Sequence, residues 1–166
     1  MMEIRQMVTA FLFHEENILM IKKKASKLHD FEFWSGLGGH IEADEFHFPK
    51  RACEREIYEE AGITAQDITE LSLRYLLLRI KGNEIRQQFV YFGRVKSGQV
   101  RASEEGEIDW VHRDKVGELH LSRIIRLMLA HYFEHPSRQE VLVGTITQIN
   151  KVPTMQWAEL KDPMVF

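Results

Sequence analysis

The sequence predicts an α+β fold in a chain of 166 residues. Runs rich in β-branched, aliphatic and aromatic residues recur in pairs around short polar turns, which is the pattern of β-hairpins. Two other segments carry apolar residues at helical spacing. The hydrophobic content of 44% and the charged content of 28% are ordinary for a folded globular protein, and the length suits one domain.

The first part of the chain predicts a hairpin, a further strand and a glycine-rich loop. Residues 4–13 and 18–22 flank a polar turn and form the hairpin. Residues 31–34 alternate apolar and polar side chains, as a strand does, and then give way to Ser-Gly-Leu-Gly-Gly at 35–39. We therefore expect a strand that runs directly into a glycine loop.

Two helices are predicted from their apolar spacing and their end signals. The first spans residues 49–61, because Pro49 suits a first helical turn and Gly62 supplies a C-terminal stop. The second spans residues 119–133 and ends before Pro136.

A second hairpin is predicted between the two helices. Residues 71–80 and 85–95 are strand-like and are joined by Lys-Gly-Asn-Glu at 81–84, where glycine and asparagine permit a tight turn. A short strand is expected at residues 108–111.

The C-terminal part of the chain predicts an appended hairpin over residues 141–160. We expect residues 1–135 to form the main domain and residues 136–166 a β-like C-terminal extension. The extension either packs on the same domain or lies at the interface of a homodimer.

Composition and charge narrow the function classes. Twenty-two Lys and Arg against 25 Asp and Glu give a net charge of −3, whereas a protein that coats a long nucleic acid needs a basic surface. Cys53, the single cysteine, can form neither an internal disulfide nor a thiolate zinc site, which favours a reducing, cytoplasmic location. The apolar run at residues 7–13 is too short for a membrane span of about 20 residues, so no membrane partner is expected.

A cluster of glutamates lies within the first predicted helix. Residues 54–60 read Glu-Arg-Glu-Ile-Tyr-Glu-Glu, and Glu56 has Glu59 at i+3 and Glu60 at i+4, so their carboxylates share one face. Like charges at these spacings destabilise a helix by about 0.2–0.5 kcal/mol per pair. Glu59 and Glu60 also lie in the last turn, where the helix dipole disfavours acids. Local helix stability therefore argues against the arrangement.

Two interpretations of the cluster remain open from the residues themselves. One is a solvated acidic face in which Arg55 pairs with Glu59. The other is a divalent metal site, because hard cations prefer carboxylate oxygens and the upstream glycines let a backbone carbonyl and a bulky ligand approach. The glycine loop at 36–39 is not followed by Lys-Ser/Thr and lacks a spaced third glycine, so it is neither a P-loop nor a dinucleotide fingerprint.

Residues 39–63, GHIEADEFHFPKRACEREIYEEAGI, resemble the Nudix box. The pattern of that family is Gly, five residues, Glu, seven residues, then Arg-Glu-apolar-x-Glu-Glu-x-Gly-apolar. The matching residues are Gly39, Glu45, Arg55, Glu56, Ile57, Glu59, Glu60, Gly62 and Ile63. The strand and double glycine before the box and the Glu-Gly-Glu-x-x-Trp-Val segment at 105–111 are also similar, so the resemblance covers about residues 4–135.

The match departs from the family pattern at one place. Nine residues, Phe46 to Glu54, separate Glu45 from Arg55 where the family has seven. Because the helix register behind Pro49 looks normal, we place the two extra residues in the loop at 46–48. The insertion puts the role of Glu45 in question and leaves the helix glutamates intact.

The resemblance implies an α/β/α sandwich with a mixed β-sheet. It also implies Mg²⁺-dependent hydrolysis, with Mn²⁺ as the alternative ion, of a nucleoside diphosphate linked to a group X. The substrate would be a nucleoside triphosphate, such as an oxidised dNTP, or a nucleotide sugar. The implied metal ligands are the Gly38 carbonyl, Glu56, Glu59 and Glu60, with Glu59 alternatively orienting water and Arg55 holding the carboxylates by ion pairing.

A general base and phosphate contacts would complete such a site. Glu105 and Glu107 are both candidates for the base, and an exposed acidic loop is the alternative for each. Gly39, His40 and Lys22 are candidates for substrate contact, although a solvated strand end explains the lysine equally well. The basic residues of the second hairpin could likewise either contact the substrate or be solvated strand residues. They are Arg74, Arg79 and Arg86.

The rival function is a non-catalytic nucleotide sensor of the same fold. A sensor has no need of the unfavourable glutamate cluster, so the intact set of Arg55, Glu56, Glu59 and Glu60 favours the enzyme. Either function gives the protein a small nucleotide as its partner.

Overall fold

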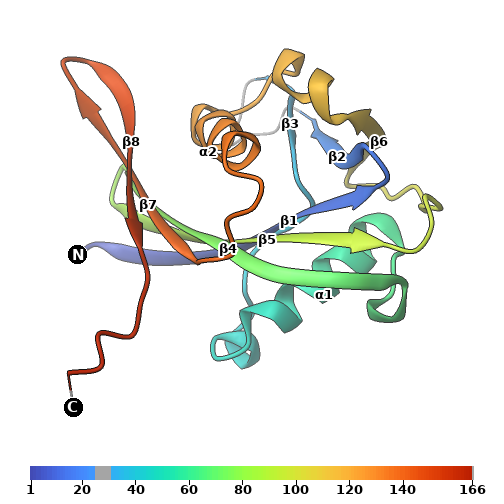
Figure 1. The fold of residues 1–166 in the computed structure, drawn as a ribbon, viewed down its shortest axis with the longest axis horizontal. Coiled ribbons are helices and arrows are strands. Elements are labelled where there is room, and N and C mark those ends of the chain that lie inside the picture. The colour runs from blue at the N-terminus through green and yellow to red at the C-terminus, as the bar shows by residue number, and fades with distance from the viewer. Residues whose placement is uncertain (25–30, 166) are drawn as a thin grey trace.

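The computed structural model describes residues 1–24 and 31–165, and a mixed β-sheet lies between its two main helices (Figure 1). The strands are β1 (Glu3–His14), β2 (Asn17–Lys23), β3 (Phe33–Ser35), β4 (Ile68–Lys81), β5 (Glu84–Val95), β6 (Gly106–His112), β7 (Leu142–Ile149) and β8 (Val152–Glu159). The helices are α1 (Pro49–Ala61) and α2 (Arg123–Glu134), with short 3-10 turns η1 (Ala43–Glu45), η2 (Ala65–Asp67) and η3 (Arg113–Glu118).

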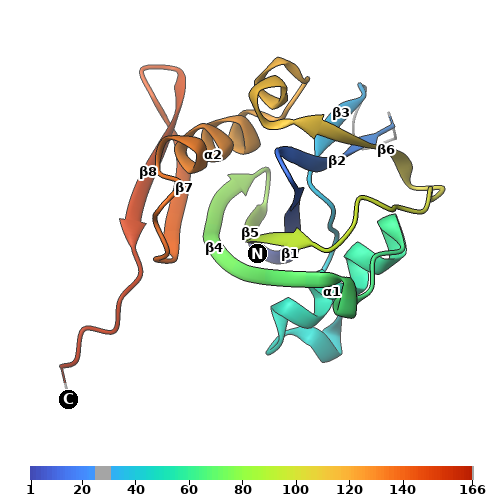
Figure 2. The same ribbon diagram turned by 45° about the vertical axis from the view of Figure 1, so that its right-hand side comes forward.

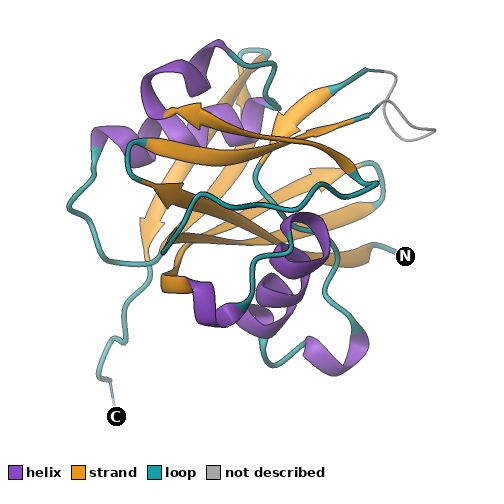
Figure 3. Cartoon of the chain, turned by 90° about the vertical axis from the view of Figure 1, so that its right-hand side faces the viewer, coloured by secondary structure: helices purple, strands orange, loops and turns teal. Residues whose placement is uncertain are grey.

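The sheet has the order β3-β2-β1-β5-β4-β7-β8, and β6 pairs with β2 off this path. β1 with β5 and β4 with β7 are parallel pairs, whereas the other strand pairs are antiparallel. Figure 2 shows that β4 is strongly curved, and its pairing with β5 has two register shifts of the kind that bend a strand. The predicted mixed sheet between helices is confirmed (Figure 3).

Helix α1 has the bounds that the sequence predicts. Pro49 is its first residue, and Gly62 adopts a left-handed φ of 69° while its N–H donates to the carbonyl of Tyr58. Glycine reaches this conformation without a Cβ penalty, which is why the helix ends there.

Helix α2 begins later than predicted, at Arg123 rather than Leu119. Ser122 is extended, and its hydroxyl accepts a hydrogen bond from the Ile125 N–H, so it is the N-cap. Leu121, which fits the helical spacing, instead lies in a bridge with Trp34. The apolar spacing therefore extends to the N-terminal side of the true helix start. The helix begins after Ser122 because this residue is its N-cap.

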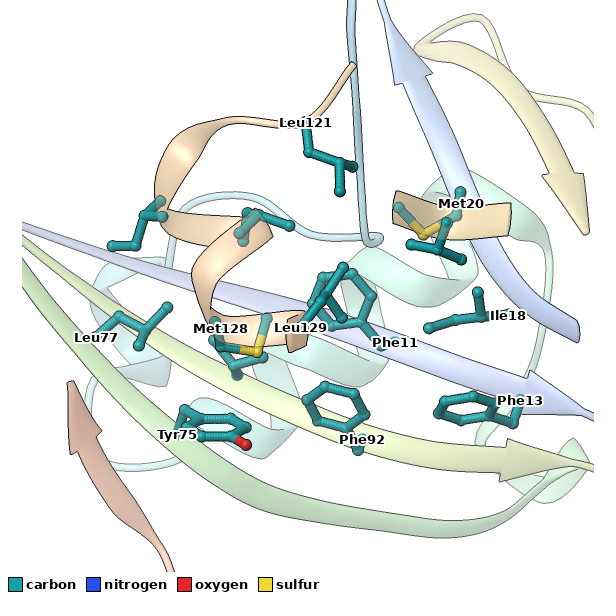
Figure 4. Packing of buried hydrophobic residues seen from close by; sticks show 14 of the residues in the cluster. Phe11, Phe13, Ile18, Met20, Tyr75, Leu77, Phe92, Leu121, Met128 and Leu129 are labelled. Atoms are coloured by element: carbon teal, nitrogen blue, oxygen red, sulfur yellow. The ribbon is translucent and has the colours of Figure 1, made fainter. Parts of the chain in front are cut away.

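The two faces of the sheet carry two hydrophobic cores because successive strand residues point to opposite faces. On β1, Val8, Ala10 and Leu12 belong to the core under α1. Phe11 and Phe13 belong to the core under α2, where Phe11 and Phe92 stack with ring centroids 5.2 Å apart (Figure 4). Met128 and Leu129 of α2 close this second core.

The C-terminal extension forms the predicted hairpin, β7–β8, and continues the main sheet. β7 pairs in parallel with β4, with Leu142 opposite Tyr75. From β8, the Trp157 ring lies 5.2 Å from that of Tyr75 and 4.4 Å from that of His131 on α2. The extension therefore packs on this chain, and a dimer interface there stays a prediction.

The helices of the described residues are all too short or too polar to cross a membrane. Cys53 is a free, buried cysteine on the core-facing side of α1, and burial raises the pKa of its thiol.

Candidate active site

The glycine loop lies directly against β1, and this contact positions the site. The Val8 N–H donates to the Gly39 carbonyl at 2.9 Å, and the Ala10 N–H donates to that of Leu37 at 2.7 Å. A Cβ at Gly38 would overlap the Val8 carbonyl, and its φ of +152° disfavours other residues as well. Glycine is therefore required for the loop to approach β1 and to face the end of α1.

Glu60 lies fully buried between the glycine loop and β2. Its Oε2 accepts a 2.7 Å hydrogen bond from the Gly38 N–H. The Lys23 ammonium donates to Oε1 of Glu60 at 3.2 Å and to the Gly38 carbonyl at 3.0 Å. Burial raises the pKa of Glu60 to about 7, although the charge of Lys23 opposes this shift. Lys23 thus contacts two of the four groups expected to bind a metal.

Arg55 joins the remaining carboxylates into one network. It donates from Nε and Nη2 to the two oxygens of Glu45, each at 2.9 Å, and from Nη1 to Glu56 at 2.8 Å and Glu59 at 3.1 Å. It also reaches the His40 carbonyl at 3.0 Å. The hydrogen bonds from Arg55 lower the pKa of Glu45, whereas burial raises that of Glu56.

The two residues inserted into the box do not separate Glu45 from the network. The 3-10 turn η1 ends at Glu45, and residues 46–48 connect it to the first residue of α1. Glu45 is buried and pairs with Arg55. Residues 46–48, where we place the insertion, therefore lie before the helix, and α1 has its predicted bounds.

These groups border a pocket of about 890 Å³. The two loop glycines and three glutamates line one part of it: Gly38, Gly39, Glu56, Glu59 and Glu105. A second part is aromatic, formed by Phe31, Phe33 and His120, with the Phe31 and His120 rings 5.3 Å apart. A third part is cationic and consists of Arg5, Arg79, Lys81 and Arg86.

The structure brings most of the candidate site residues to this pocket. Those that line it are Gly38, Gly39, His40, Arg55, Glu56, Glu59 and Glu105. Glu60 lies behind the lining and touches it through Gly38 and Lys23. Lys22 and Glu107 are not among the lining residues; the ammonium of Lys22 lies 3.0 Å from Glu32 and 3.9 Å from Glu107.

Lys23 occupies the position at the pocket that the sequence interpretation gave to Lys22. Strand alternation is the signal that distinguishes the two lysines. Leu19 and Ile21 face the core under α1, and Lys23 continues that face. Lys22 follows Ile18 and Met20, which face the other core. The cationic and aromatic parts of the pocket were the larger omission, since they come from segments far apart in the sequence.

The donor chemistry of the site suits a hard divalent cation. Carboxylates of Glu56, Glu59 and Glu60 and the Gly38 carbonyl are oxygen donors of the kind that Mg²⁺ and Mn²⁺ take. Across residues 1–24 and 31–165, no group of three acidic, histidine or cysteine side chains is gathered closely enough to hold an ion. Lys23 and Arg55 neutralise the carboxylates in this arrangement, so a cation would have to replace Lys23 at Glu60 and Gly38.

Comparison with known proteins identifies the family of the chain and finds solved structures with a similar fold. A family model described as NUDIX domain matches residues 4–132. The crystal structure of a MutT protein from Bacillus halodurans is 19% identical, covers 92% of this chain and 97% of its own, and has a TM-score of 0.73. A MutT NUDIX hydrolase from Burkholderia pseudomallei is 25% identical, with 77% and 97% covered and a TM-score of 0.63.

A third similar structure was solved with a ligand. The NUDIX domain of Shewanella oneidensis NrtR, in a complex with ADP ribose, is 10% identical, covers 82% of this chain and 90% of its own, and has a TM-score of 0.64. A comparison with curated proteins found no match.

Proposed function

Because the chain belongs to the NUDIX family and is a pyrophosphohydrolase of that family, we propose that it hydrolyses the diphosphate of a small nucleotide with Mg²⁺. Mn²⁺ is the alternative ion. The substrate class is a nucleoside diphosphate linked to X, either a nucleoside triphosphate such as an oxidised dNTP or a nucleotide sugar. The observation that carries the proposal is the set of Glu56, Glu59 and Glu60 on one turn of α1 beside the Gly38 carbonyl and a pocket large enough for a nucleotide.

The chain's own residues would hold the ion and position the substrate. We assign the ligands to the Gly38 carbonyl, Glu56, Glu59 and Glu60. A divalent ion bound there supplies charge neutralisation of the diphosphate and a bound water of lowered pKa. Arg55 fixes the direction of Glu56 and Glu59 through its hydrogen bonds, so the carboxylates are oriented before substrate arrives.

The reaction joins a water oxygen to one phosphorus and breaks the anhydride bond of that phosphorus. The leaving phosphate keeps the bridging oxygen, and a carboxylate takes the proton of the water. We assign this base to Glu105 rather than Glu107, because Glu105 lines the pocket together with Glu56 and Glu59. Glu59 is the alternative base from the box itself.

A pyrophosphatase screen with Glu60→Gln tests the assignment. We expect the wild type to release phosphate products from at least one nucleotide in Mg²⁺ and none in EDTA. Glu60→Gln keeps the shape of the side chain but removes its charge, so turnover should fall at least about a hundredfold. Glu54→Gln, on the same helix and outside the network, is the matched control.

Equal turnover by the wild type and Glu60→Gln would contradict the metal assignment. Tight nucleotide binding with no turnover in any divalent ion would instead favour the sensor function. Product identity also sets the substrate class, because a nucleoside triphosphate gives a monophosphate and pyrophosphate, whereas a nucleotide sugar gives a monophosphate and a sugar phosphate.

We also propose a cytoplasmic location, supported by the free and buried Cys53. A homodimer through the β7–β8 hairpin is a proposal of the same standing, and size-exclusion chromatography with light scattering would test it.

A further inference from the structure

One wall of the pocket carries a row of arginines from three neighbouring strands. In the parallel pairing of β1 with β5, Arg5 lies opposite Arg86. In the antiparallel pairing of β5 with β4, Arg86 lies opposite Arg79. Directly opposed residues of adjacent strands point to the same face, so the three guanidinium groups share one side of the sheet. Lys81, two residues beyond Arg79, is on that side as well.

This cationic row (Arg5, Arg79, Lys81 and Arg86) faces the pocket. On β4, Tyr75 and Leu77 belong to the core under α2, and every second residue after Leu77 continues the same face. All members of the row line the pocket that also holds Glu56 and Glu59. By strand register the row lies next to the β4–β5 turn and near the beginning of β1, where the Glu3 N–H donates to the Asn83 carbonyl at 3.0 Å.

The row has too few acids to balance its charge. Glu84 serves two of its members: its Oε1 lies 2.6 Å from Nη2 of Arg5 and its Oε2 lies 2.9 Å from Nη2 of Arg86. Within the described parts of the chain, Arg79 and Lys81 have no carboxylate within 4.0 Å. Like charges directly opposite each other destabilise a sheet, so the row costs stability unless something binds to it.

Two members of the row have lowered pKa values, and the charge of Arg86 contributes to both shifts. The positive charge of Arg86 lowers the pKa of Lys81. Burial, followed by the charge of Arg86, lowers that of Arg79. An anion in this part of the pocket would relieve both effects.

We propose that the cationic row is an anion subsite that binds a phosphate group of the substrate other than the diphosphate that is hydrolysed. Guanidinium groups donate two parallel hydrogen bonds to phosphate, and three of them side by side suit a dianionic phosphate. The proposal deepens the proposed function and rests on it, because one substrate would reach from the glutamates to the row. The substrate class is then a nucleotide with a further phosphate, either in a longer phosphate chain or as a phosphomonoester on X.

Matched ligand pairs that differ by one phosphate test the subsite and separate its two sources. ATP against adenosine 5′-tetraphosphate tests the longer chain, and ADP-ribose against ADP-ribose 1″-phosphate, whose additional phosphate is on the distal ribose, tests the phosphomonoester on X. Binding is measured by calorimetry in EDTA, so that it does not depend on hydrolysis, and kcat/KM is measured in Mg²⁺. In one of the pairs the wild type should prefer the phosphate-rich member by about 10-fold to 100-fold, the range of one to two charged hydrogen bonds.

Arg79→Gln and Lys81→Gln should each reduce that preference toward one. Lys81 is exposed, so its variant has little reason to misfold if Arg79→Gln does. Arg94→Gln removes the same charge from β5 at an exposed place outside the pocket, over the Phe13 ring, and should keep the preference. A wild type without preference in either pair, or a preference that survives both variants, overturns the subsite.

The calorimetry also separates this proposal from the proposed function. If no nucleotide is hydrolysed but the binding preference appears and depends on Arg79 and Lys81, the hydrolase function fails and the row stands as a phosphate-binding site for a bound nucleotide. If hydrolysis occurs without the preference, the subsite fails and the hydrolase function stands.

Discussion

A β-carbon at Gly39 would lie 2.5 Å from Oε1 of Glu56 and 2.7 Å from its Oε2, closer than nonbonded atoms approach. Glu56 in turn accepts the 2.8 Å hydrogen bond from Arg55. The position of this carboxylate therefore depends on two residues at once: Arg55 holds it, and the missing side chain at Gly39 leaves the space that it fills.

We predict that Gly39→Ala impairs activity far more than it impairs folding. The new methyl group must displace the Glu56 carboxylate, and a shift of about 1 Å at a reacting group costs on the order of a hundredfold in rate. Crowding of this kind costs about 1–3 kcal/mol of stability. The kcat/KM and the midpoint of urea unfolding would be compared with those of Gly117→Ala, because a β-carbon at Gly117 meets nothing within 4 Å. A Gly39→Ala protein with wild-type kcat/KM would show that Glu56 need not lie where it does.

Residue-level chemistry could be predicted from the sequence where it depends on local spacing. The glutamates of α1 are three and four positions apart, and this fixes their common face once the helix forms. Choosing Lys22 or Lys23 requires knowledge of which face of β2 meets α1, and that depends on packing. Arg5 and Arg79 belong to one row only because β5 lies between their strands, a register that no local pattern encodes.

At the scale of elements, end signals decided how well each helix was predicted. α1 has proline at its start and glycine after its end, and its observed bounds are the predicted ones. α2 lacks a proline at its start, and the apolar spacing ran on into Leu119 and Leu121, which are not helical. A capping serine cannot be distinguished from other serines in a sequence, because serine side chains also bond to the backbone in turns and loops.

The β7–β8 hairpin offers a prediction about how the extension is held on the sheet. A β-carbon at Gly144 would lie 2.5 Å from the Trp157 ring and 2.9 Å from the side chain of Leu77. Leu77 is fully buried, so it cannot yield to the solvent side. We expect Gly144→Ala to cost about 1–3 kcal/mol in unfolding free energy, because the ring of Trp157 must move off the strand.

Thermal unfolding and tryptophan fluorescence would measure this change, since Trp157 should become more exposed to water. Thr147→Ala, further along β7 and exposed, is the control for a substitution in the same strand. A Gly144→Ala protein as stable as the wild type, with unchanged fluorescence, would mean that the hairpin is not closely packed on β4.

For the whole molecule, folding brings together charges that a chain would otherwise keep apart. One part of the pocket lining contains Glu56 and Glu59, and another part contains Arg79 and Arg86. The net charge of −3 conceals both accumulations. A ligand of opposite sign would stabilise each group: a cation that replaces Lys23 at Glu60 for the glutamates, and a phosphate for the arginines. Binding should therefore be measurable as stability.

We predict that Mg²⁺ or Mn²⁺ raises the melting temperature of the wild type and not that of Glu60→Gln. An ion at about a hundred times its dissociation constant adds about 2.7 kcal/mol. In a protein of this size that corresponds to a rise of roughly 5–10 °C. Differential scanning calorimetry would follow the shift, with EDTA to reverse it, NaCl at matched ionic strength as the salt control and Glu54→Gln as the control variant.

Without metal at pH 8, we expect the wild type to lose its stability advantage over Glu60→Gln. Burial raises the pKa of Glu60 to about 7 in the folded chain, so the folded state holds this proton more tightly than the unfolded state does. The stability contributed by the protonated group is present below the unfolded pKa, falls as the pH rises toward 7 and is lost above it. At pH 8 in EDTA, Glu60→Gln escapes this cost and should be at least as stable as the wild type, whereas in Mg²⁺ the wild type should be the more stable of the two. If Glu60→Gln were less stable than the wild type by the same amount with and without metal, the carboxylate would serve the fold rather than an ion.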